Sequence, residues 1–474
     1  MENQEYNCYV AGKKIQSGQK LIIKSPFDGQ IAGYVFQANK SHVEEAIVKG
    51  LSYKVKLSRY QRYEILEKTR KLLTERKEEF ARTITSESGL CIRETRYEVG
   101  RAHDVLLFAA MECLKDDGQI FSCDISPTGK QRKIFTLREP LNLAVAITPF
   151  NHPLNQVAHK IIPAIAAGTP VILKPSEKTP ITAIKFAELL FEAGLPETML
   201  SVLLGPTAEV AEVLVTDPRI DLVSFTGSVA VGKKIAEKAG YKKVILELGG
   251  NDPIIILEDA DLDLAVQLAA EGAFRNSGQR CTAVKRILVH EKIESEFTKK
   301  FIDKTATYLC GDPFNEETRV GTVIDEPAAV YLEQVVSDAV KMGAVIRYGG
   351  KRTGALLEPT VIDNVPRNCK MVVQESFGPL APIITIKNLD DAIQLTNSTA
   401  FGLSSAIVTN HMPSILQAVR ELRVGTVNVN EVPGYRIENS PFGGIKDSGL
   451  GIKEGVIEAI KCFSFVKTFS LPWD

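Results

Sequence analysis

The chain has 474 residues, of which 44% are hydrophobic and 24% are charged, and its formal net charge is −1. This composition is that of a globular protein too long for one ordinary core, so we expect about three domains. The near-zero net charge gives no indication of nucleic acid or an anionic membrane surface as a partner.

No targeting or membrane segment is indicated. Residues 1–5 are polar and acidic, unlike a secretory signal or a transit peptide. The longest apolar stretch, residues 161–173, is interrupted by Pro163, Gly168 and Pro170 and is too short to span a bilayer. Eight cysteines are present without Cys-x-x-Cys spacing. We therefore expect no metal site, no disulfide framework and a reducing, cytoplasmic location.

The first predicted element is an amphipathic helical region over residues 60–85, where apolar positions recur at helical spacing among charges. From residue 142 onward, short apolar runs alternate with amphipathic segments, which is typical of parallel strands connected by helices. The predicted strands are residues 143–147, 170–173, 200–204, 221–225 and 244–248, and the predicted helices are residues 155–167, 181–194, 208–216 and 229–239.

A second alternating block follows, from residue 252 to about residue 430. Its predicted strands are residues 253–257, 286–290, 381–386, 405–409 and 425–430. The two alternating blocks therefore predict two α/β domains in tandem. Residues 121–137 and 461–471 are extended and fit neither domain. Such strands often pair between subunits, and a peripheral hairpin inside one subunit is equally compatible with the sequence.

A glycine-containing turn follows the fourth predicted strand, within residues 225–234. Small residues there let backbone N–H groups and the helix dipole approach a phosphate. Gly227, Gly232 and Lys233 have the spacing of a nucleotide-triphosphate loop, but Lys234 stands where a magnesium-binding Ser or Thr is required. An NTPase or kinase is therefore disfavoured. Ordinary packing between strand and helix is the alternative to phosphate binding.

Cys281 lies in a sequence context typical of a thiol nucleophile. Its neighbours over residues 277–283 are small or polar, and Arg280 precedes it directly. A positive neighbour and solvent access lower the pKa of a thiol and favour the thiolate. A buried structural cysteine, the alternative, normally has apolar neighbours, which are missing here.

Two further residues have the chemistry of a catalytic site. Glu247 ends an apolar run, where desolvation raises a carboxyl pKa toward the range of a general base, although a structural salt bridge is equally compatible. Asn151 lies in a proline-flanked loop over residues 148–153. Its amide donates two N–H bonds without charge, which suits an oxyanion, while a simple turn is the alternative.

These four motifs, in this order and with this spacing, resemble the aldehyde dehydrogenase superfamily over essentially the whole chain. Residues 173–177, 375–379 and 441–444 are similar to further family segments. The resemblance implies an α/β fold with a Rossmann-type cofactor domain, an α/β catalytic domain and a β-strand oligomerisation element. The implied NAD-binding domain comprises residues 1–120 and 138–250 and is completed by about 431–460. The implied catalytic domain, residues 251–430, carries Cys281. Residues 121–137 and 461–474 are the implied oligomerisation strands of a homodimer or homotetramer.

By this resemblance Cys281 is the nucleophile, Glu247 the general base and Asn151 the oxyanion donor. The implied reaction begins with attack of the thiolate on the aldehyde. The thiohemiacetal then passes a hydride to a nicotinamide cofactor and leaves a thioester. Water activated by Glu247 releases the carboxylic acid. No metal is required.

The resemblance also implies a set of cofactor contacts. Lys174 and Glu177 match residues that hold the adenosine ribose, Ser228 matches a pyrophosphate contact, and Glu375 with Phe377 match the nicotinamide end. The other implied positions are Thr148, Pro149, Phe150, Ser176, Gly205, Phe225, Thr226, Gly227, Val231, Leu248 and Gly249. A carboxylate at position 177 accepts ribose hydroxyls and repels a 2′-phosphate, so NAD is favoured over NADP, which remains possible. Ser376 departs from the family, which usually has Ile there.

An anion pocket beside the aldehyde is suggested by Arg101, Arg280 and His152, with Thr282 as a further substrate contact. Guanidinium groups bind phosphonate or phosphate with forked hydrogen bonds. In the alternative, Arg101 pairs with Glu98 and Arg280 serves only the thiol.

The substrate is the least determined property. Residues 276–286 resemble those of phosphonoacetaldehyde dehydrogenase with its lactaldehyde-type relatives, and those of the non-phosphorylating glyceraldehyde-3-phosphate dehydrogenase. His152 and residues 97–104 favour the phosphonoacetaldehyde type. A non-catalytic dinucleotide-binding protein is a further alternative, against which the complete set of Cys281, Glu247 and Asn151 argues.

Overall fold

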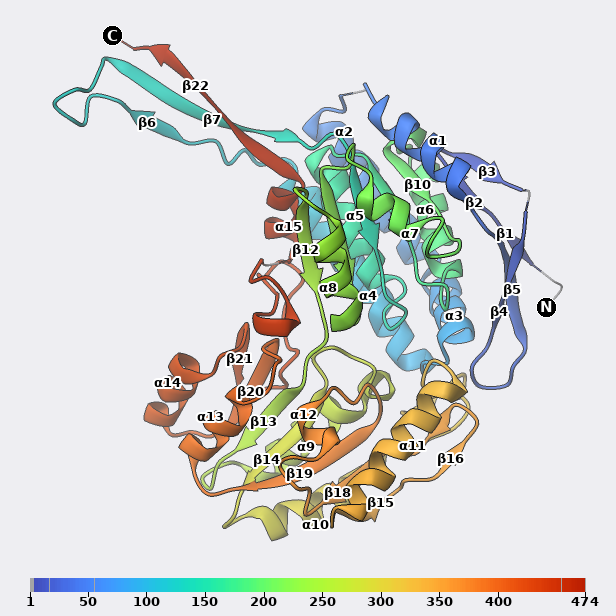
Figure 1. Cartoon of the computed structure of the whole chain (residues 1–474), viewed down its shortest axis with the longest axis vertical. Helices are drawn as coiled ribbons and strands as arrows, with labels where there is room; N and C mark the ends of the chain where they lie inside the picture. Colours follow the sequence, from blue (N-terminus) through green and yellow to red (C-terminus); the bar gives the residue numbers. More distant parts are fainter. Residues whose placement is uncertain (1–3, 17, 55, 453, 474) are drawn as a thin grey trace.

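The computed structural model describes residues 4–473 except residues 17, 55 and 453. Two α/β lobes lie one above the other, and a narrow β-sheet projects from the upper lobe (Figure 1). The α/β class and the two tandem domains with parallel strands expected from the sequence agree with this architecture. The domain boundaries stay predictions, and residues 1–3 and 474 of those ranges lie outside the described residues.

The upper lobe is built on a seven-stranded sheet with the order β12-β11-β8-β9-β10-β2-β3. Its strands are β2 (Cys8–Val10), β3 (Lys13–Ile15), β8 (Ala144–Ile147), β9 (Val171–Lys174), β10 (Leu200–Val202), β11 (Leu222–Thr226) and β12 (Lys243–Glu247). The five strands from β8 to β12 are parallel, and all five were predicted to within two residues. The antiparallel strands β2 and β3, at one end of the sheet and only three residues each, were not predicted.

Helices cover both faces of this sheet. They are α1 (Lys40–Leu51), α2 (Arg59–Glu75), α3 (Lys77–Ser88), α4 (Ile92–Glu112), α5 (Asn155–Ala167), α6 (Ile181–Glu192), η1 (Glu197–Met199), α7 (Ala211–Thr216), α8 (Val229–Lys238) and α15 (Val456–Cys462), beside a small sheet of β1 (Glu5–Tyr6), β4 (Lys20–Lys24) and β5 (Ile31–Phe36). The amphipathic region predicted over residues 60–85 is two helices, α2 and α3, that meet at Arg76. Among the described helices, none is long and apolar enough to cross a membrane.

The lower lobe has its own seven-stranded sheet, with the order β15-β18-β19-β14-β13-β20-β21. Its strands are β13 (Asp252–Ile256), β14 (Val284–His290), β15 (Val345–Tyr348), β18 (Thr360–Asp363), β19 (Leu380–Ile386), β20 (Ser404–Val408) and β21 (Thr426–Val429). The other elements are α9 (Leu262–Phe274), η2 (Arg275–Gly278), α10 (Glu294–Thr305), α11 (Glu326–Lys341), β16 (Arg352–Thr353), β17 (Leu356–Leu357), α12 (Lys370–Val373), α13 (Leu389–Asn397), α14 (Met412–Glu421) and η3 (Lys446–Ser448). The five strands predicted for this block are all present.

The projecting sheet consists of β6 (Ile120–Ser122), β7 (Arg132–Pro140) and β22 (Ser464–Pro472), with β7 in the centre (Figure 1). The pairing of β22 with β7 is antiparallel and brings the C-terminal segment back to the middle of the chain. Both regions that fitted neither predicted domain therefore pair with each other. The extended segment begins later than predicted, since helix α15 continues to Cys462.

A buried ion pair ties the C-terminal segment to the upper lobe. Lys160 on α5 donates from Nζ to Glu454 Oε1 at 2.8 Å and to Ser224 Oγ on β11 at 2.9 Å. The Lys160 side chain has no exposure and that of Glu454 is 6% exposed. Removing one partner of such a pair leaves the other charge desolvated without compensation.

We expect Lys160→Met to destabilise the protein by about 3–5 kcal/mol, because it strands the buried Glu454 carboxylate. Urea unfolding followed by circular dichroism measures the loss. The double variant Lys160→Met with Glu454→Met removes both charges and should recover most of it. Equal stability of the single and double variants would contradict the assignment.

Candidate active site

The loop that carries Cys281 has an unusual backbone. Asn276, Ser277 and Gly278 follow one another with φ values of +52°, +52° and +70°. Left-handed conformations are unfavourable for residues with a Cβ and persist where the surroundings enforce them. At Gly278 a Cβ would lie 2.0 Å from the carbonyl oxygen of Gly378, so only glycine fits. This backbone turns the chain sharply from α9 into the segment that presents Cys281.

Asn151 lies against this loop. Its Nδ2 donates to the carbonyl oxygen of Gln279 at 2.8 Å, two residues before Cys281. The Gln279 side chain is itself anchored, because its Oε1 accepts from the backbone N–H of Ile324 at 2.8 Å. The structure thus brings Asn151 and the loop of Cys281 together from the two lobes. The amide carries a second hydrogen, which remains suited to an oxyanion.

Lys285 connects three groups around the nucleophile loop. Its Nζ lies 2.8 Å from the carbonyl oxygen of Cys281, 2.7 Å from that of Gly250 and 2.7 Å from Glu375 Oε1. The Lys285 side chain is 2% exposed. The three bonds use all three hydrogens of the ammonium group and fix Glu375 relative to Cys281. Sequence reasoning did not single out Lys285, although two adjacent basic residues, Lys285 and Arg286, at the start of an apolar strand were an available signal.

Glu247 ends β12 and is 5% exposed. Its position is enclosed by glycines: Gly449 forms an antiparallel bridge with it, and a Cβ on Gly443 would lie 2.9 Å from its Oε1. Its charge acts on the Cys281 thiol. The structure therefore brings Glu247, Cys281 and Asn151 into one site from residues far apart in the sequence.

The protonation of Cys281 differs from the sequence expectation. The pKa of this thiol is raised to about 11, mainly by burial and also by the nearby carboxylates of Asp252 and Glu247, against the lowering effect of Lys285 and Arg436. The low thiol pKa expected from the sequence is wrong, because burial outweighs the attraction between the Cys281 thiolate and Arg280. The Arg280 guanidinium turns away to the end of α9, where Nη2 donates to the carbonyl oxygen of Gly272 at 2.9 Å.

Arginines surround His152. Its pKa lies well below the ordinary value, first because it is buried and then because of the charges of Arg101, Arg280, Arg275 and Arg436. His152 is therefore neutral at physiological pH. The four guanidinium groups around the neutral His152 ring make this part of the molecule electropositive. Arg280 contributes charge there although its Nη2 is bound to the carbonyl oxygen of Gly272.

Arg101 forms an ion pair with Glu438 and not with Glu98, so the alternative pairing considered from the sequence is wrong. Glu438 also binds His159. Glu98 has a different role, because its Oε1 accepts the backbone N–H groups of Leu154 at 2.8 Å and Asn155 at 3.0 Å. It holds the start of α5, directly after the loop of Asn151 and His152.

Arg436 was not found from the sequence. Its guanidinium stacks on the ring of Phe442 at 3.9 Å, and its charge acts on both Cys281 and Glu247. Its Nη1 is buried and has no hydrogen-bond partner among the described residues. A cavity of about 510 Å³ borders the same place, and its lining includes Tyr97, Arg101 and Arg436. No local motif marks Arg436, since it lies in an irregular segment after β21.

The predicted cofactor residues gather at the carboxyl edge of the upper sheet. Lys174 ends β9 and lies 3.4 Å from Glu177, and Thr226 ends β11. The buried hydroxyls of Thr148 and Thr226 have no hydrogen-bond partner among the described residues. In open α/β sheets, dinucleotides bind at this edge, where the strand order reverses. Unpartnered buried hydroxyls there fit a polar ligand such as NAD or NADP.

The residues predicted to contact the nicotinamide end of the cofactor lie between the two lobes. The rings of Phe150 and Phe377 meet edge to face at 5.9 Å, and a Cβ at Gly249 would lie 2.1 Å from Glu375 Oε2. Ser228 caps α8 and accepts the backbone N–H of Val231 at 3.4 Å. The structure therefore places Phe150 against Phe377 and Gly249 against Glu375.

The glycine-rich turn has a structural explanation in part. A Cβ on Gly232 would lie 2.4 Å from the Leu248 side chain, and Lys233 pairs with Asp447 at 2.8 Å. Gly205 is likewise tight, since a Cβ there would lie 2.2 Å from the carbonyl oxygen of Ala38. The resemblance to a nucleotide-triphosphate loop thus reflects close packing.

Comparison with known proteins supports the same fold and the same class of protein as the site does. Residues 14–469 match the aldehyde dehydrogenase family. The chain is 40% identical to 3-sulfolactaldehyde dehydrogenase of Priestia megaterium over 96% of each chain, and 35% identical to sulfoacetaldehyde dehydrogenase of Neptuniibacter caesariensis over 94% of this chain and 98% of that one. The structure of glyceraldehyde-3-phosphate dehydrogenase GapN from Methanocaldococcus jannaschii, complexed with NADP, superimposes with a TM-score of 0.92 at 36% identity, over 97% of this chain and 100% of that one.

The fold and these relatives define an oxidoreductase that uses NAD or NADP. The chain belongs to the aldehyde dehydrogenase family, and oxidation of an aldehyde is its class of reaction. The expected superfamily is therefore confirmed. Two of the relatives described above are named for sulfonated aldehydes and one for glyceraldehyde 3-phosphate, and none of the three is named for phosphonoacetaldehyde, so the finer assignment is not confirmed.

We expect alkylation of Cys281 to accelerate with pH. Because the thiol pKa of about 11 lies above neutrality, the thiolate fraction rises about tenfold per pH unit between pH 7 and 9. Inactivation of the cofactor-free enzyme by iodoacetamide measures this. A plateau below pH 8 would show that the thiol is already ionised there.

We expect Lys285→Met to lower kcat/KM by about 30- to 100-fold, since charge-assisted hydrogen bonds to Glu375 and to the Cys281 backbone are lost. The dissociation constant for NAD, measured by fluorescence, should rise in the same variant. Lys292→Met removes a lysine that pairs with Glu258 on the surface and serves as the matched control. Equal behaviour of the two variants would contradict a role for Lys285 in the site.

Proposed function

We propose that this protein oxidises a small aldehyde with an anionic head group to the corresponding carboxylic acid, with NAD or NADP as the acceptor. The observation that carries the proposal is the group of arginines beside Cys281. Arg436 in particular has a buried Nη1 without a partner among the described residues, next to the proposed nucleophile. A buried donor of this kind is unfavourable unless a ligand completes it.

The proposed chemistry uses residues of this chain at each step. Cys281 attacks the aldehyde carbon, and the Asn151 amide stabilises the oxyanion of the thiohemiacetal. NAD or NADP, when bound, supplies the hydride acceptor. Glu247 then removes a proton from water as it attacks the thioester, which releases the acid and restores the thiol. The raised pKa of Cys281 means that deprotonation is part of the attack, for which Glu247 is the nearby base.

We propose Lys174 and Glu177 as the residues that hold the adenosine ribose, Ser228 as the pyrophosphate contact and Glu375 as the ligand of the nicotinamide ribose. The Glu177 side chain is 44% exposed and has a distant partner in Lys174 at 3.4 Å. Its carboxylate favours NAD, because a 2′-phosphate beside it would be repelled. Lys174 would offset part of this repulsion, so NADP is the second choice.

A sulfonated aldehyde is the preferred substrate. Sulfonate and phosphonate both present three oxygens to guanidinium donors, so the arginines suit either. Identity of 40% over 96% of the chain to a 3-sulfolactaldehyde dehydrogenase favours the sulfonate. Phosphonoacetaldehyde, expected from the sequence, and glyceraldehyde 3-phosphate are the competing substrates.

We also propose that the sheet of β6, β7 and β22 forms the contact of a homodimer or homotetramer. It projects from the upper lobe, and Phe121, Val466 and Trp473 on it are each about half exposed. Exposed apolar side chains on a narrow sheet are typical of surfaces that bind another chain.

We expect Arg436→Gln to raise the KM for 3-sulfolactaldehyde by about tenfold to a hundredfold while leaving that for propanal nearly unchanged, since only the anionic substrate loses an ionic hydrogen bond. Steady-state NADH formation with both aldehydes measures the ratio. Arg280→Gln is the matched comparison and should be less selective, because its Nη2 is already bound by α9. Equal losses on both aldehydes in Arg436→Gln would contradict the anionic substrate, and retained turnover in Cys281→Ser would contradict the reaction itself.

A further inference from the structure

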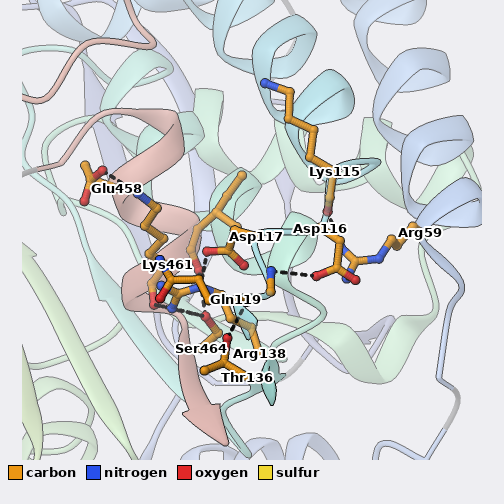
Figure 2. Close-up of polar contacts among 12 residues, drawn as sticks. Arg59, Lys115, Asp116, Asp117, Gln119, Thr136, Arg138, Glu458, Lys461 and Ser464 are labelled. Carbon is orange, nitrogen blue, oxygen red and sulfur yellow. Dashed lines mark hydrogen bonds and ion pairs between the residues drawn. The ribbon is translucent and has the colours of Figure 1, made fainter. Parts of the chain in front are cut away.

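A second cavity lies far from Cys281, at the root of the projecting sheet. Its volume is about 500 Å³, and it is bounded by the start of α2, the end of α4, the base of β7, α15 and the first residue of β22. Figure 2 shows the polar contacts along this region. Neither the proposed catalytic residues nor the proposed cofactor residues line it.

Basic side chains outnumber acidic ones in the lining of this cavity. Lysines and arginines contribute seven residues and acidic side chains three: Lys54, Lys56, Arg59, Arg62, Lys115, Arg138 and Lys461 against Glu112, Asp117 and Glu139. The cavity therefore has a formal excess of four positive charges. Such an excess inside a concave surface attracts anions.

Most of these cations have a carboxylate of their own. Arg138 pairs with Asp117 at 2.6 Å, Arg59 with Asp116 at 3.2 Å and Lys461 with Glu458 at 2.9 Å (Figure 2). The first two pairs tie β7 and α2 to the segment after α4, and the third lies within α15; together these three pairs form the framework of ion pairs around the cavity. None of the carboxylates in these pairs binds Arg62.

Arg62 is the exception in this wall. It bonds a helix end, with Nη1 donating to the carbonyl oxygen of Ala166 near the end of α5, but its Nε is buried and has no hydrogen-bond partner among the described residues. Burial lowers its pKa, and the groups that act on its charge are Cys113, Arg59 and Tyr53, none of them a carboxylate. A partly buried guanidinium with a free donor lacks the anion that would compensate it.

We propose that this cavity binds a small phosphate-class anion, with Arg62 as the central donor and Lys54 and Lys56 at the entrance. A guanidinium donates in a fork that matches phosphate oxygens, and the two lysines add charge that a dianion requires. Both lysines are exposed and neither is bound in the framework of ion pairs. A bound anion would touch both the body of the upper lobe and the root of the projecting sheet.

Calorimetric titration of the full-length protein with inorganic phosphate, at constant ionic strength and with NAD at saturation, tests the proposal. NAD occupies the dinucleotide site, and the Arg436→Gln background removes the proposed anion contact beside Cys281. Binding that persists in that background is expected. Arg62→Gln should weaken it at least tenfold while kcat/KM for the aldehyde stays unchanged, because Arg62 lies outside the proposed active site.

Two further variants keep the test decisive if Arg62→Gln harms folding. Lys54→Gln with Lys56→Gln changes only exposed side chains and should weaken phosphate binding about threefold or more. Arg420→Gln, on exposed α14 of the other lobe, is the control of equal charge and should bind as the unmodified protein does. Phosphate binding unchanged in both the Arg62 and the lysine variants would overturn the proposal. No phosphate binding, together with an altered oligomeric state in Arg62→Gln, would overturn it in favour of a contact between subunits.

Discussion

The ammonium group of Lys285 is the interaction on which the arrangement of the site depends. It joins the backbone of Cys281, the backbone of Gly250 and the carboxylate of Glu375, and so connects β14, the chain after β12 and the segment after α12. A buried ammonium is stable only when its hydrogens are bound, so these three groups cannot move apart independently. These bonds therefore fix the proposed nucleophile and the proposed nicotinamide contact relative to each other.

The electrostatics of the site follow from this enclosure. Burial opposes ionisation of Cys281 and charging of His152, and the surrounding guanidinium groups oppose the latter further. A neutral histidine and a protonated thiol lie among arginines that carry charge at any physiological pH. In the proposed reaction, the anionic group of the substrate pairs with Arg436 while the aldehyde lies near Cys281 and Glu247, so the same site would set both specificity and reaction.

Several features were readable from the sequence for physical reasons. The parallel strands β8 to β12 were predicted because strands buried on both faces are continuous apolar runs. Cys281 was singled out because its neighbours are small or polar, Glu247 because it ends an apolar run, and Asn151 because it lies in a proline-flanked loop. The antiparallel β2 and β3 were too short to show a period, and the direction of the Arg280 side chain depends on carbonyl groups of α9 that no local pattern reveals.

The sequence by itself determined the family, the α/β class and the three residues proposed for the chemistry, because these depend on local patterns of polarity and spacing. Only the tertiary structure decided how the charges around Cys281 act. It raised the thiol pKa where a neighbouring arginine suggested the reverse, turned Arg280 toward α9, and brought Lys285 and Arg436 to the site. Burial and distance between charges set these effects, and both exist only once segments far apart in the chain have packed together.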